Sequence, residues 1–278
     1  MTEPVYSVKA HENVVNYIAG CGSLTQSNES SGCGASELVT CSRDGSVKVW
    51  DPRTSTSVCE LVCAKKANGN SANKRDCWTV AFGNSFDNSN RVVCAGYDNG
   101  DIKMLDLKMN AMIYEYNLNN GIVDIEFDRT HVPMNKMVVT TLESKFFVFD
   151  LKTMHSVDGF AYSTQPVLAF SILLWLQKTS LHKKSVYTYN RDIWCTTGGN
   201  GTVQLWKYSY PSQRSIIDKE TNTKKGVMGE IVPLTDAHKC SDQPLISWHW
   251  NKDKIGLACA TSLDQKVRVF FVTKLHKI

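Results

Sequence analysis

The stretch that decides the fold is residues 44–51, with the sequence DGSVKVWD. Its first residues suit a tight turn, the following residues alternate between apolar and polar as a strand does, and a tryptophan closes the strand. The same eight-residue pattern returns as NGDIKMLD from Asn99, ESKFFVFD from Glu143, NGTVQLWK from Asn200 and DQKVRVFF from Asp264. Five copies predict a repeat protein, in which each unit buries its apolar face against a neighbour.

The apolar positions of this octapeptide agree in all five copies. Positions four, six and seven are always apolar, although apolar residues make up only 42% of the chain. A second short apolar segment precedes each turn, so each turn should join two antiparallel strands. These upstream segments are residues 37–41, 91–95, 136–140, 192–196 and 256–260.

The spacing of the copies is typical of WD repeats, which run about 40–45 residues and form the blades of a β-propeller. Position seven recurs after 55, 44, 57 and 64 residues, so one step matches and the others carry insertions. The polar segments 20–36, 65–73 and 212–236 should be surface loops of this kind. We therefore expect an all-β propeller with about five blades, forming a single domain over residues 1–278.

One repeat carries the polar residues that WD repeats hydrogen-bond between blades. His11, Ser42, Asp44 and Trp50 match that pattern, and we assign them a structural role. The alternative, a hydrolase triad of His11, Ser42 and Asp44, lacks a nucleophile elbow. The other turns, which lack the full set, should rely on packing. Further structural positions at the ends of the repeated strands are Asp51, Asp106, Asp150 and Trp206.

Composition argues against several classes of protein. A net charge of +4 is too small to indicate a nucleic-acid-binding face. The apolar run at residues 166–176 is shorter than the roughly 18 residues of a membrane-spanning helix, and residues 1–10 lack the core of a signal peptide. The ten cysteines include no CxxC pair, which indicates free thiols in a reducing compartment such as the cytoplasm.

No catalytic motif is recognisable. The sequence lacks a glycine-rich phosphate loop, an HExxH motif and a recognisable carboxylate pair. His238, Cys240 and His249 lack the second pair of ligands that a zinc finger needs. We expect no enzymatic activity, no cofactor and no metal, and instead a rigid scaffold that binds proteins through its loops.

Several longer stretches resemble one family of WD-repeat proteins, the monad-type assembly factors for axonemal dyneins. They are residues 4–9, 42–53, 73–84, 91–103 and 272–278. The resemblance implies a cytoplasmic adaptor that acts as a monomer within a chaperone complex of RuvB-like ATPases and prefoldin-like subunits. Such an adaptor would support the folding and stability of axonemal dynein heavy chains before they enter cilia. A link to apoptosis is also implied.

The chain departs from this family in two ways. The family has a seven-bladed ring that begins earlier, so about two amino-terminal blades would be absent and the ring would be incomplete or open. Residues 5–9 could otherwise close it as an outer strand beside residues 266–272. At residues 164–189, an apolar run and a Lys/Tyr-rich stretch replace the innermost strand of a blade. A retained intron, a mis-predicted exon or a lineage-specific insertion would explain that segment, which puts a normal blade there in doubt.

The candidate contact surface surrounds the insertion at residues 65–73. Exposed arginine and tyrosine are favoured at binding hot spots, although ordinary solvated turn residues are the alternative reading. The functional alternatives are an RNA-binding or ubiquitin-ligase substrate-receptor propeller, an apoptosis-linked adaptor, or a non-functional fragment. The candidate contact residues are Arg43, Lys74, Arg75, Asp76, Tyr97 and Asp98.

Overall fold

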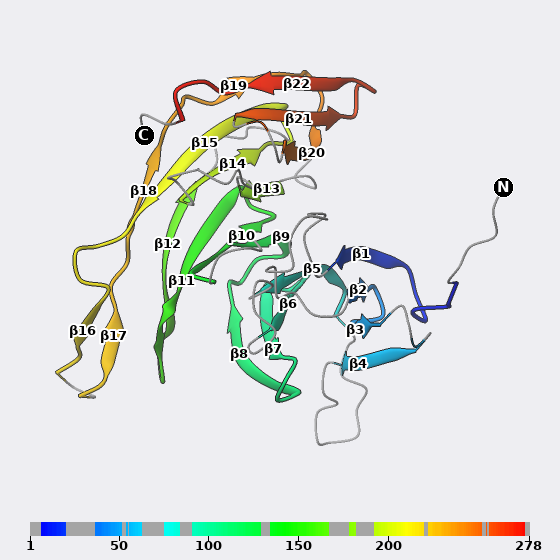
Figure 1. The fold of residues 1–278 in the computed structure, drawn as a ribbon, viewed down its shortest axis with the longest axis vertical. Helices are drawn as coiled ribbons and strands as arrows, with labels where there is room; N and C mark the ends of the chain where they lie inside the picture. The colour runs from blue at the N-terminus through cyan, green and yellow to red at the C-terminus, as the bar shows by residue number, and fades with distance from the viewer. Residues whose placement is uncertain are drawn as a thin grey trace. The chain divides into compact units, whose positions relative to one another are not determined.

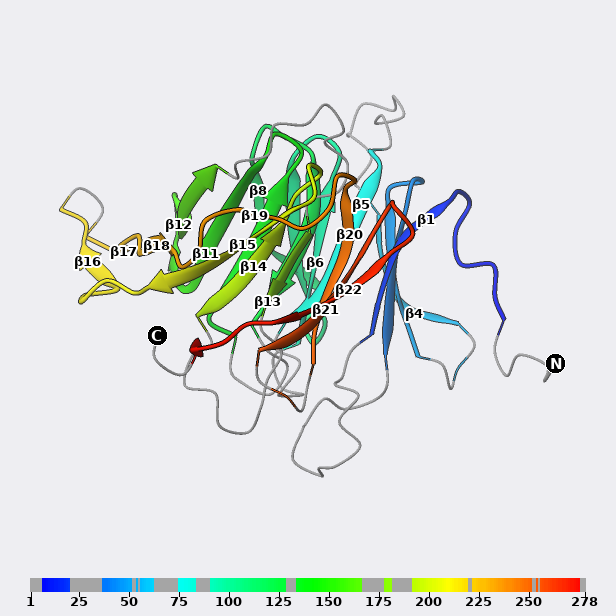
Figure 2. The same cartoon turned by 90° about the horizontal axis from the view of Figure 1, so that it is seen from above.

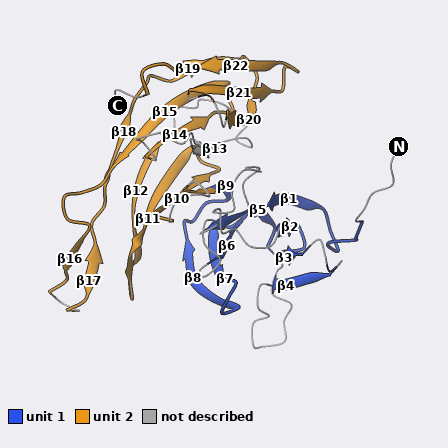
Figure 3. Ribbon diagram, in the orientation of Figure 1, with its two compact units in different colours: residues 1–125, 130–133 blue, residues 126–129, 134–278 orange. Residues whose placement is uncertain are grey.

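The computed structural model shows a chain built from short antiparallel strands (Figure 1). It describes residues 7–20, 37–51, 54, 56–62, 75–83, 91–128, 134–166, 178–181, 192–219, 222–251, 254 and 256–275. The chain divides into two compact units, one of residues 1–125 with 130–133 and one of residues 126–129 with 134–278 (Figure 3). Among the described residues, no helix is long and apolar enough to cross a membrane.

The first unit holds two four-stranded sheets. In each sheet the strands follow chain order and pair antiparallel with their neighbours, as expected for propeller blades. The first sheet contains β1 (Val15–Gly20), β2 (Leu38–Ser42), β3 (Ser46–Trp50) and β4 (Ser57–Val62). The second contains β5 (Cys77–Gly83), β6 (Val92–Tyr97), β7 (Asp101–Asp106) and β8 (Ala111–Asn117).

Three further sheets complete the five. The third has the order β12-β11-β10-β9, with β9 (Ile122–Phe127), β10 (Lys136–Thr141), β11 (Lys145–His155) and β12 (Gly159–Pro166). The fourth joins β13 (Lys178–Leu181), β14 (Ile193–Thr197), β15 (Thr202–Ser209) and β18 (Glu230–Pro233), and β19 (His238–Lys239) also pairs with β15. The fifth contains β20 (Leu245–Trp250), β21 (Leu257–Ser262) and β22 (Val267–Phe271). A separate hairpin pairs β16 (Ser215–Ile217) with β17 (Lys224–Gly226).

The repeated octapeptide has one backbone conformation in all five sheets. Each copy is a turn that leads into a strand, and that strand pairs antiparallel with the upstream segment, as predicted. The second residue of every copy has a positive φ, a region in which glycine is free of steric cost. Three copies have glycine there, and the other two have polar residues. These residues are Gly45, Gly100, Ser144, Gly201 and Gln265.

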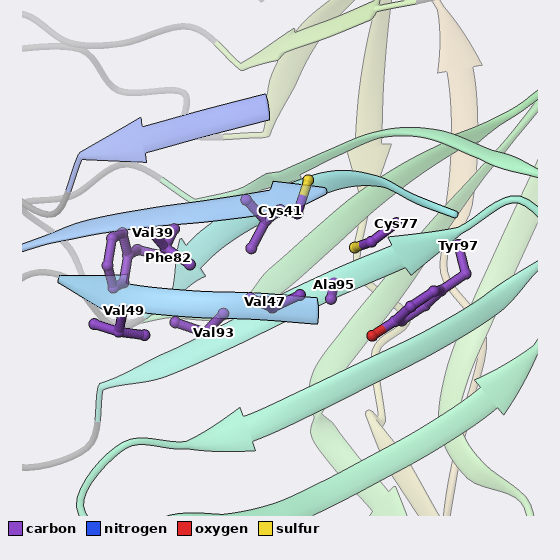
Figure 4. Close-up of a cluster of buried hydrophobic side chains, with 10 residues drawn as sticks. Val39, Cys41, Val47, Val49, Cys77, Phe82, Val93, Ala95 and Tyr97 are labelled. Atoms are coloured by element: carbon purple, nitrogen blue, oxygen red, sulfur yellow. The ribbon is translucent and has the colours of Figure 1, made fainter. Parts of the chain in front are cut away.

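The core lies between neighbouring sheets. In the first unit, Val47 and Val49 of β3 pack with Val39 and Cys41 against residues of β5 and β6 such as Phe82 (Figure 4). In the second unit, the same repeat positions of the fourth sheet, Val203 and Leu205, pack against the fifth sheet. In these two copies, the apolar positions of the octapeptide thus face the sheet that follows in the chain.

The fifth copy differs from this pattern. Val267 and Val269 are 68% and 70% exposed, whereas the equivalent Val47 and Val49 are 2% and 4% exposed. The burial seen in the first copy is therefore absent from the fifth, although its residues are equally apolar. β22 is the edge strand of a three-stranded sheet among the described residues, and the exposure of Val267 and Val269 shows that this face is uncovered there.

The unusual segment at residues 164–189 supplies a regular strand. β12 extends to Pro166, and Lys178–Leu181 forms β13, which pairs with β14 from Lys178–Thr197 to Leu181–Trp194. The described residues of this segment thus include one strand of the fourth sheet, and the rest of it lies outside the described residues. An aberrant or inserted segment at residues 164–189 stays a prediction. Of the possible closing strand at residues 5–9, the described residues 7–9 are not in a strand. The single domain and the open ring stay predictions.

Candidate interaction site

A buried chain of hydrogen bonds holds the turn between β2 and β3. Trp50 Nε1 donates to Thr40 Oγ1 at 2.8 Å, and His11 Nε2 lies 2.7 Å from the same oxygen. His11 Nδ1 is 2.8 Å from Ser46 Oγ, which in turn donates to Asp44 Oδ1 at 2.6 Å. The side chains of His11 and Asp44 are 0% and 8% exposed, so these polar groups satisfy one another away from water.

The middle hydroxyl of this chain belongs to Thr40 and not to Ser42, which corrects the sequence prediction. Leu38 pairs with Trp50, and Thr40 is two residues further along β2, so Thr40 and Trp50 share a face. Ser42 Oγ instead accepts from the Asp44 amide at 3.0 Å. Counting with a period of two from Trp50 would have found Thr40. Because Ser42 bonds within the turn, it does not make the contact with His11 that a hydrolase triad of His11, Ser42 and Asp44 would need.

The same bonds recur in the fourth sheet. Trp206 Nε1 donates to Thr196 Oγ1 at 2.9 Å, with the ten-residue separation that also joins Thr40 and Trp50. Asn200 Oδ1 accepts from the Thr202 hydroxyl at 2.6 Å, as Asp44 does from Ser46. Turns outside the first sheet therefore do not rely on packing alone, contrary to the sequence prediction.

The aspartates that end the repeated strands also hold local backbone. Asp106 Oδ1 accepts from the amides of Lys108 and Met109 at 2.7 and 3.0 Å. Asp150 is fully buried, and its Oδ1 accepts from the Lys152 amide at 3.0 Å. Asp51 is 8% exposed, and its carbonyl accepts from the Thr54 amide at 3.0 Å. These contacts are those of structural residues.

We expect Asp44 to make the first sheet sensitive to acid. Burial by itself raises the pKa of Asp44, but hydrogen bonds from Ser46 and from the Glu12 amide outweigh it and lower the pKa to about 2. A depressed carboxyl pKa adds stability above the unfolded value of 3.8, and this stability is lost as the pH falls toward about 2. Asparagine at this position would not titrate.

We therefore expect the stability difference between the wild type and Asp44→Asn to shrink by up to about 2 kcal/mol between about pH 5 and pH 2. Urea unfolding at several pH values measures it. Asp106→Asn serves as the comparison. Among the described residues, the Asp106 carboxylate accepts hydrogen bonds from the Lys108 and Met109 amides and not from a hydroxyl. A difference for Asp44→Asn that stays constant over this range would contradict the assignment.

The predicted contact residues come together beside this turn. Arg43 Nε lies 3.0 Å from Asp76 Oδ2, and the Asp98 amide donates to the Asp76 carbonyl at 2.9 Å. The backbone of Gly45 passes so close to Arg75 that a Cβ at Gly45 would lie 2.7 Å from the Arg75 carbonyl oxygen. Glycine at position 45 thus lets the β2–β3 turn lie against the residues that precede β5.

The side chains of this cluster differ in exposure. The Arg43 side chain is 61% exposed and Arg75 is also exposed, whereas the Asp76 side chain is 28% exposed. Burial raises the pKa of Asp98, and nearby Arg75 only partly opposes this shift. The two arginines are therefore the exposed charged groups of this cluster, beside two partly buried carboxylates.

One predicted residue, Tyr97, does not join this surface. Tyr97 is 0% exposed and belongs to the buried cluster of the first two sheets (Figure 4), so its prediction as a contact residue is wrong. The reason is that β6 is a central strand whose six residues are all buried. Lys74 lies outside the described residues. Within the described chain, no group of three or more His, Cys, Asp or Glu residues is placed to hold a metal ion.

Comparison with known proteins places the chain in a family. The family model "WD domain, G-beta repeat" matches residues 2–51. "Dynein axonemal assembly factor 10" of Bos taurus is 46% identical over 275 residues, which cover 99% of this chain and 71% of the relative. The chain belongs to the dynein axonemal assembly factor 10 family. Its member from Chlamydomonas reinhardtii is 40% identical over 99% of this chain and 72% of its own length.

Solved structures agree with the family in fold. The Saccharomyces cerevisiae protein Sqt1 superimposes with a TM-score of 0.59 at 14% identity, over 97% of this chain and 62% of its own length. A structure of BBS1N in complex with ARL6DN gives a TM-score of 0.59 at 9% identity, over 98% of this chain and 67% of that one. At such identities the likeness concerns the fold alone. The chain is thus a WD-repeat β-propeller with five blades, and its dynein axonemal assembly factor 10 relatives are longer.

Proposed function

We propose that this chain is a non-enzymatic scaffold in the preassembly of axonemal dyneins. The observation that carries the proposal is the 46% identity to a dynein axonemal assembly factor along 99% of the chain. The site geometry supports it, because His11 bonds to Thr40 and to Ser46, and Ser46 bonds to Asp44. These bonds hold the turn between β2 and β3 and leave the nearby Arg43 and Arg75 to contact a partner.

The partners that we propose are axonemal dynein heavy chains and a cytoplasmic chaperone complex of RuvB-like ATPases and prefoldin-like subunits. The chain would act as one copy within that complex and hold the client beside the ATPases. Arg43 and Arg75 supply exposed guanidinium groups, which pair well with carboxylates because their donors lie in a plane. An acidic surface on the chaperone complex or on the dynein chain is the contact that this site fits.

The test is capture from a cytosolic extract of ciliated cells, with the full chain as bait. We expect Arg75→Glu to reduce recovery of RuvB-like ATPase and dynein heavy chain about fivefold to tenfold, because a reversed rim charge slows association. Unfolding stability should stay within about 0.5 kcal/mol of the wild type. Quantitative mass spectrometry of the captured proteins gives both subunit recoveries.

Lys108→Glu is the matched control, since Lys108 is an exposed cation in the turn between β7 and β8 of the same unit. Its recovery of both partners should equal that of the wild type. Capture of ubiquitin-ligase subunits in place of chaperone subunits would favour a substrate-receptor function. If the wild-type chain recovers neither a chaperone subunit nor a dynein chain, the proposed function is wrong.

A further inference from the structure

The fourth sheet carries a hairpin that the WD-repeat pattern does not require. Between β15 and β18 the chain leaves the sheet, forms β16 and β17, and returns (Figure 1). The hairpin projects beyond the ends of β15 and β18 and lies beside the long strand β11 of the third sheet (Figure 2). Everything in this arrangement belongs to the second unit, whereas the residues of the interaction site described above belong to the first unit.

Charged and aromatic contacts anchor the first half of the hairpin. Arg214 Nη2 and Nε bond to the two carboxylate oxygens of buried Asp150 at 2.6 and 3.0 Å. The guanidinium also lies 4.5 Å from the ring centre of Tyr210. A two-pronged bond to a buried carboxylate fixes both position and orientation. The residue just before β16 is thus held firmly on β11.

The second half is anchored at the extended end of β11. His155 Nδ1 accepts from the amides of Val157 and Asp158, at 3.3 and 3.0 Å, so Nε2 carries the hydrogen and donates to Thr223 Oγ1 at 2.7 Å. Lys225 Nζ lies 2.7 Å from Asp158 Oδ2. At Gly226 the backbone is so close to β11 that a Cβ would lie 2.4 Å from Thr153 Cβ. The hairpin is therefore a seated element and not a loose loop.

This seated hairpin leaves one edge open. Among the described residues, β16 has β17 as its only strand neighbour. The Val227 amide bonds to the Arg214 carbonyl, and the Asp218 amide bonds to the Thr223 carbonyl. Because bonded and non-bonded pairs alternate along an antiparallel ladder, the backbone groups of Ser215 and Ile217 point away from β17. They form an unpaired edge to which another strand can bond.

The side chains around this edge are apolar and basic. Ile216, Ile217 and Met228 are 51%, 67% and 63% exposed. Lys219 and Lys224 are exposed, and neither has an ion-pair partner within the described chain. Apolar groups that ordinary surfaces keep covered are thus combined with positive charge and an open backbone edge.

We propose that β16 is a docking edge for an extended acidic segment of a partner protein. The segment would add as a third strand beside β16, with its backbone bonded to Ser215 and Ile217. Its apolar side chains would cover Ile216 and Ile217, and its carboxylates would lie near Lys219 and Lys224. Because the hairpin is already anchored through Arg214 and Thr223, little ordering of this chain would oppose binding.

The test uses the full chain and a synthetic fluorescent peptide of about nine residues that alternates valine and glutamate. Fluorescence anisotropy measures its binding. Ile217→Pro removes the outward amide but leaves the β16–β17 bonds in place, since proline is tolerated on an edge whose amide faces solvent. We expect this variant to bind the peptide at least about tenfold more weakly. Lys224→Glu should also weaken binding.

Ile217→Thr is the matched control, because threonine keeps the outward amide and is also β-branched. It should bind more tightly than Ile217→Pro, and equal melting temperatures of the two variants show that the hairpin is intact. A lysine–valine peptide that binds as well as the glutamate–valine peptide would overturn the acidic partner. Unchanged peptide binding by Ile217→Pro would overturn strand addition.

A membrane or a second copy of the chain could also bind the edge of β16, and each would give a different experimental result. Binding to phosphatidylserine vesicles without binding to the acidic peptide would assign the surface to a membrane and refute the proposal. Self-association that Ile217→Pro abolishes, again without peptide binding, would assign it to a second copy of the chain and likewise refute the proposal. Capture of dynein or chaperone subunits through Arg75 does not depend on this edge, so the two proposals fail independently.

Discussion

Replacing Lys136 by methionine should destabilise the protein by about 3–5 kcal/mol, the usual cost of breaking a buried ion pair by removing one partner. Lys136 is 0% exposed, and its ammonium lies 3.0 Å from Asp128 Oδ1 and 2.7 Å from Asp192 Oδ1. Burial alone lowers the pKa of Lys136, but the two carboxylates outweigh it and raise the pKa, so the group is charged. Methionine would leave both carboxylates without their cation. Denaturant unfolding measures the loss.

Two variants test the cause of this loss. Adding Asp128→Asn to Lys136→Met should restore part of the stability, because it removes one uncompensated charge. Lys103→Met is the matched control, since Lys103 pairs at 2.8 Å with Glu115, whose side chain is 50% exposed. Exposed pairs contribute roughly 0–1 kcal/mol, so this change should cost little. If Lys136→Met costs as little stability as Lys103→Met, the buried network does not stabilise the fold.

This network occupies a recurring position in the repeat. Lys136 begins β10, and its partner Asp192 immediately precedes β14 in the next sheet. In the first unit, Glu37 immediately precedes β2 and makes a two-pronged contact with Arg91, which immediately precedes β6. Four of the five upstream segments begin with a charged residue, so the signal was present in the sequence. The pairing needs the three-dimensional alignment of neighbouring sheets, which no single repeat contains.

The strands were predictable because a half-buried strand alternates with a period of two, and the octapeptide showed that period five times. Glycine at positions 45, 100 and 201 marked the turns for the same local reason, since a positive φ favours it. Exposure was less predictable. Tyr97 flanks a turn in the sequence, but it lies at the buried end of a central strand. Val269 occupies an apolar position of the octapeptide, but it lies on an exposed edge strand. Both outcomes depend on the neighbouring sheet.

The hairpin was the part of the chain that sequence described least well. Residues 212–236 were expected to be a polar surface loop, yet β16 and β17 form within them. Their order comes from contacts far away in the chain, such as Arg214 with Asp150 and Thr223 with His155. A short hairpin is marginal alone, so the anchoring contacts and not local propensity decide its structure.

Trp50→Ala should cost about 3–5 kcal/mol, because it leaves a cavity in a buried position. Trp50 is 5% exposed, and its Nε1 donates to the hydroxyl of Thr40, which also contacts His11. Loss of the indole removes packing and one end of the hydrogen-bonded chain. Thermal and denaturant unfolding should both shift to lower stability. A melting temperature that does not change would show that Trp50 is not part of the core.

Smaller substitutions separate the indole's volume from its hydrogen bond. Trp50→Phe keeps most of the apolar surface and loses the donor, so it should cost less than Trp50→Ala. Thr40→Val removes the hydroxyl that joins Trp50 to His11 and leaves two buried partners unpaired, at about 1–3 kcal/mol. Ser42→Ala loses a bond within the turn alone and should cost less than Thr40→Val. If Ser42→Ala is the more damaging of the two, the chain runs through Ser42, as the sequence pattern first indicated, and the assignment of Thr40 is wrong.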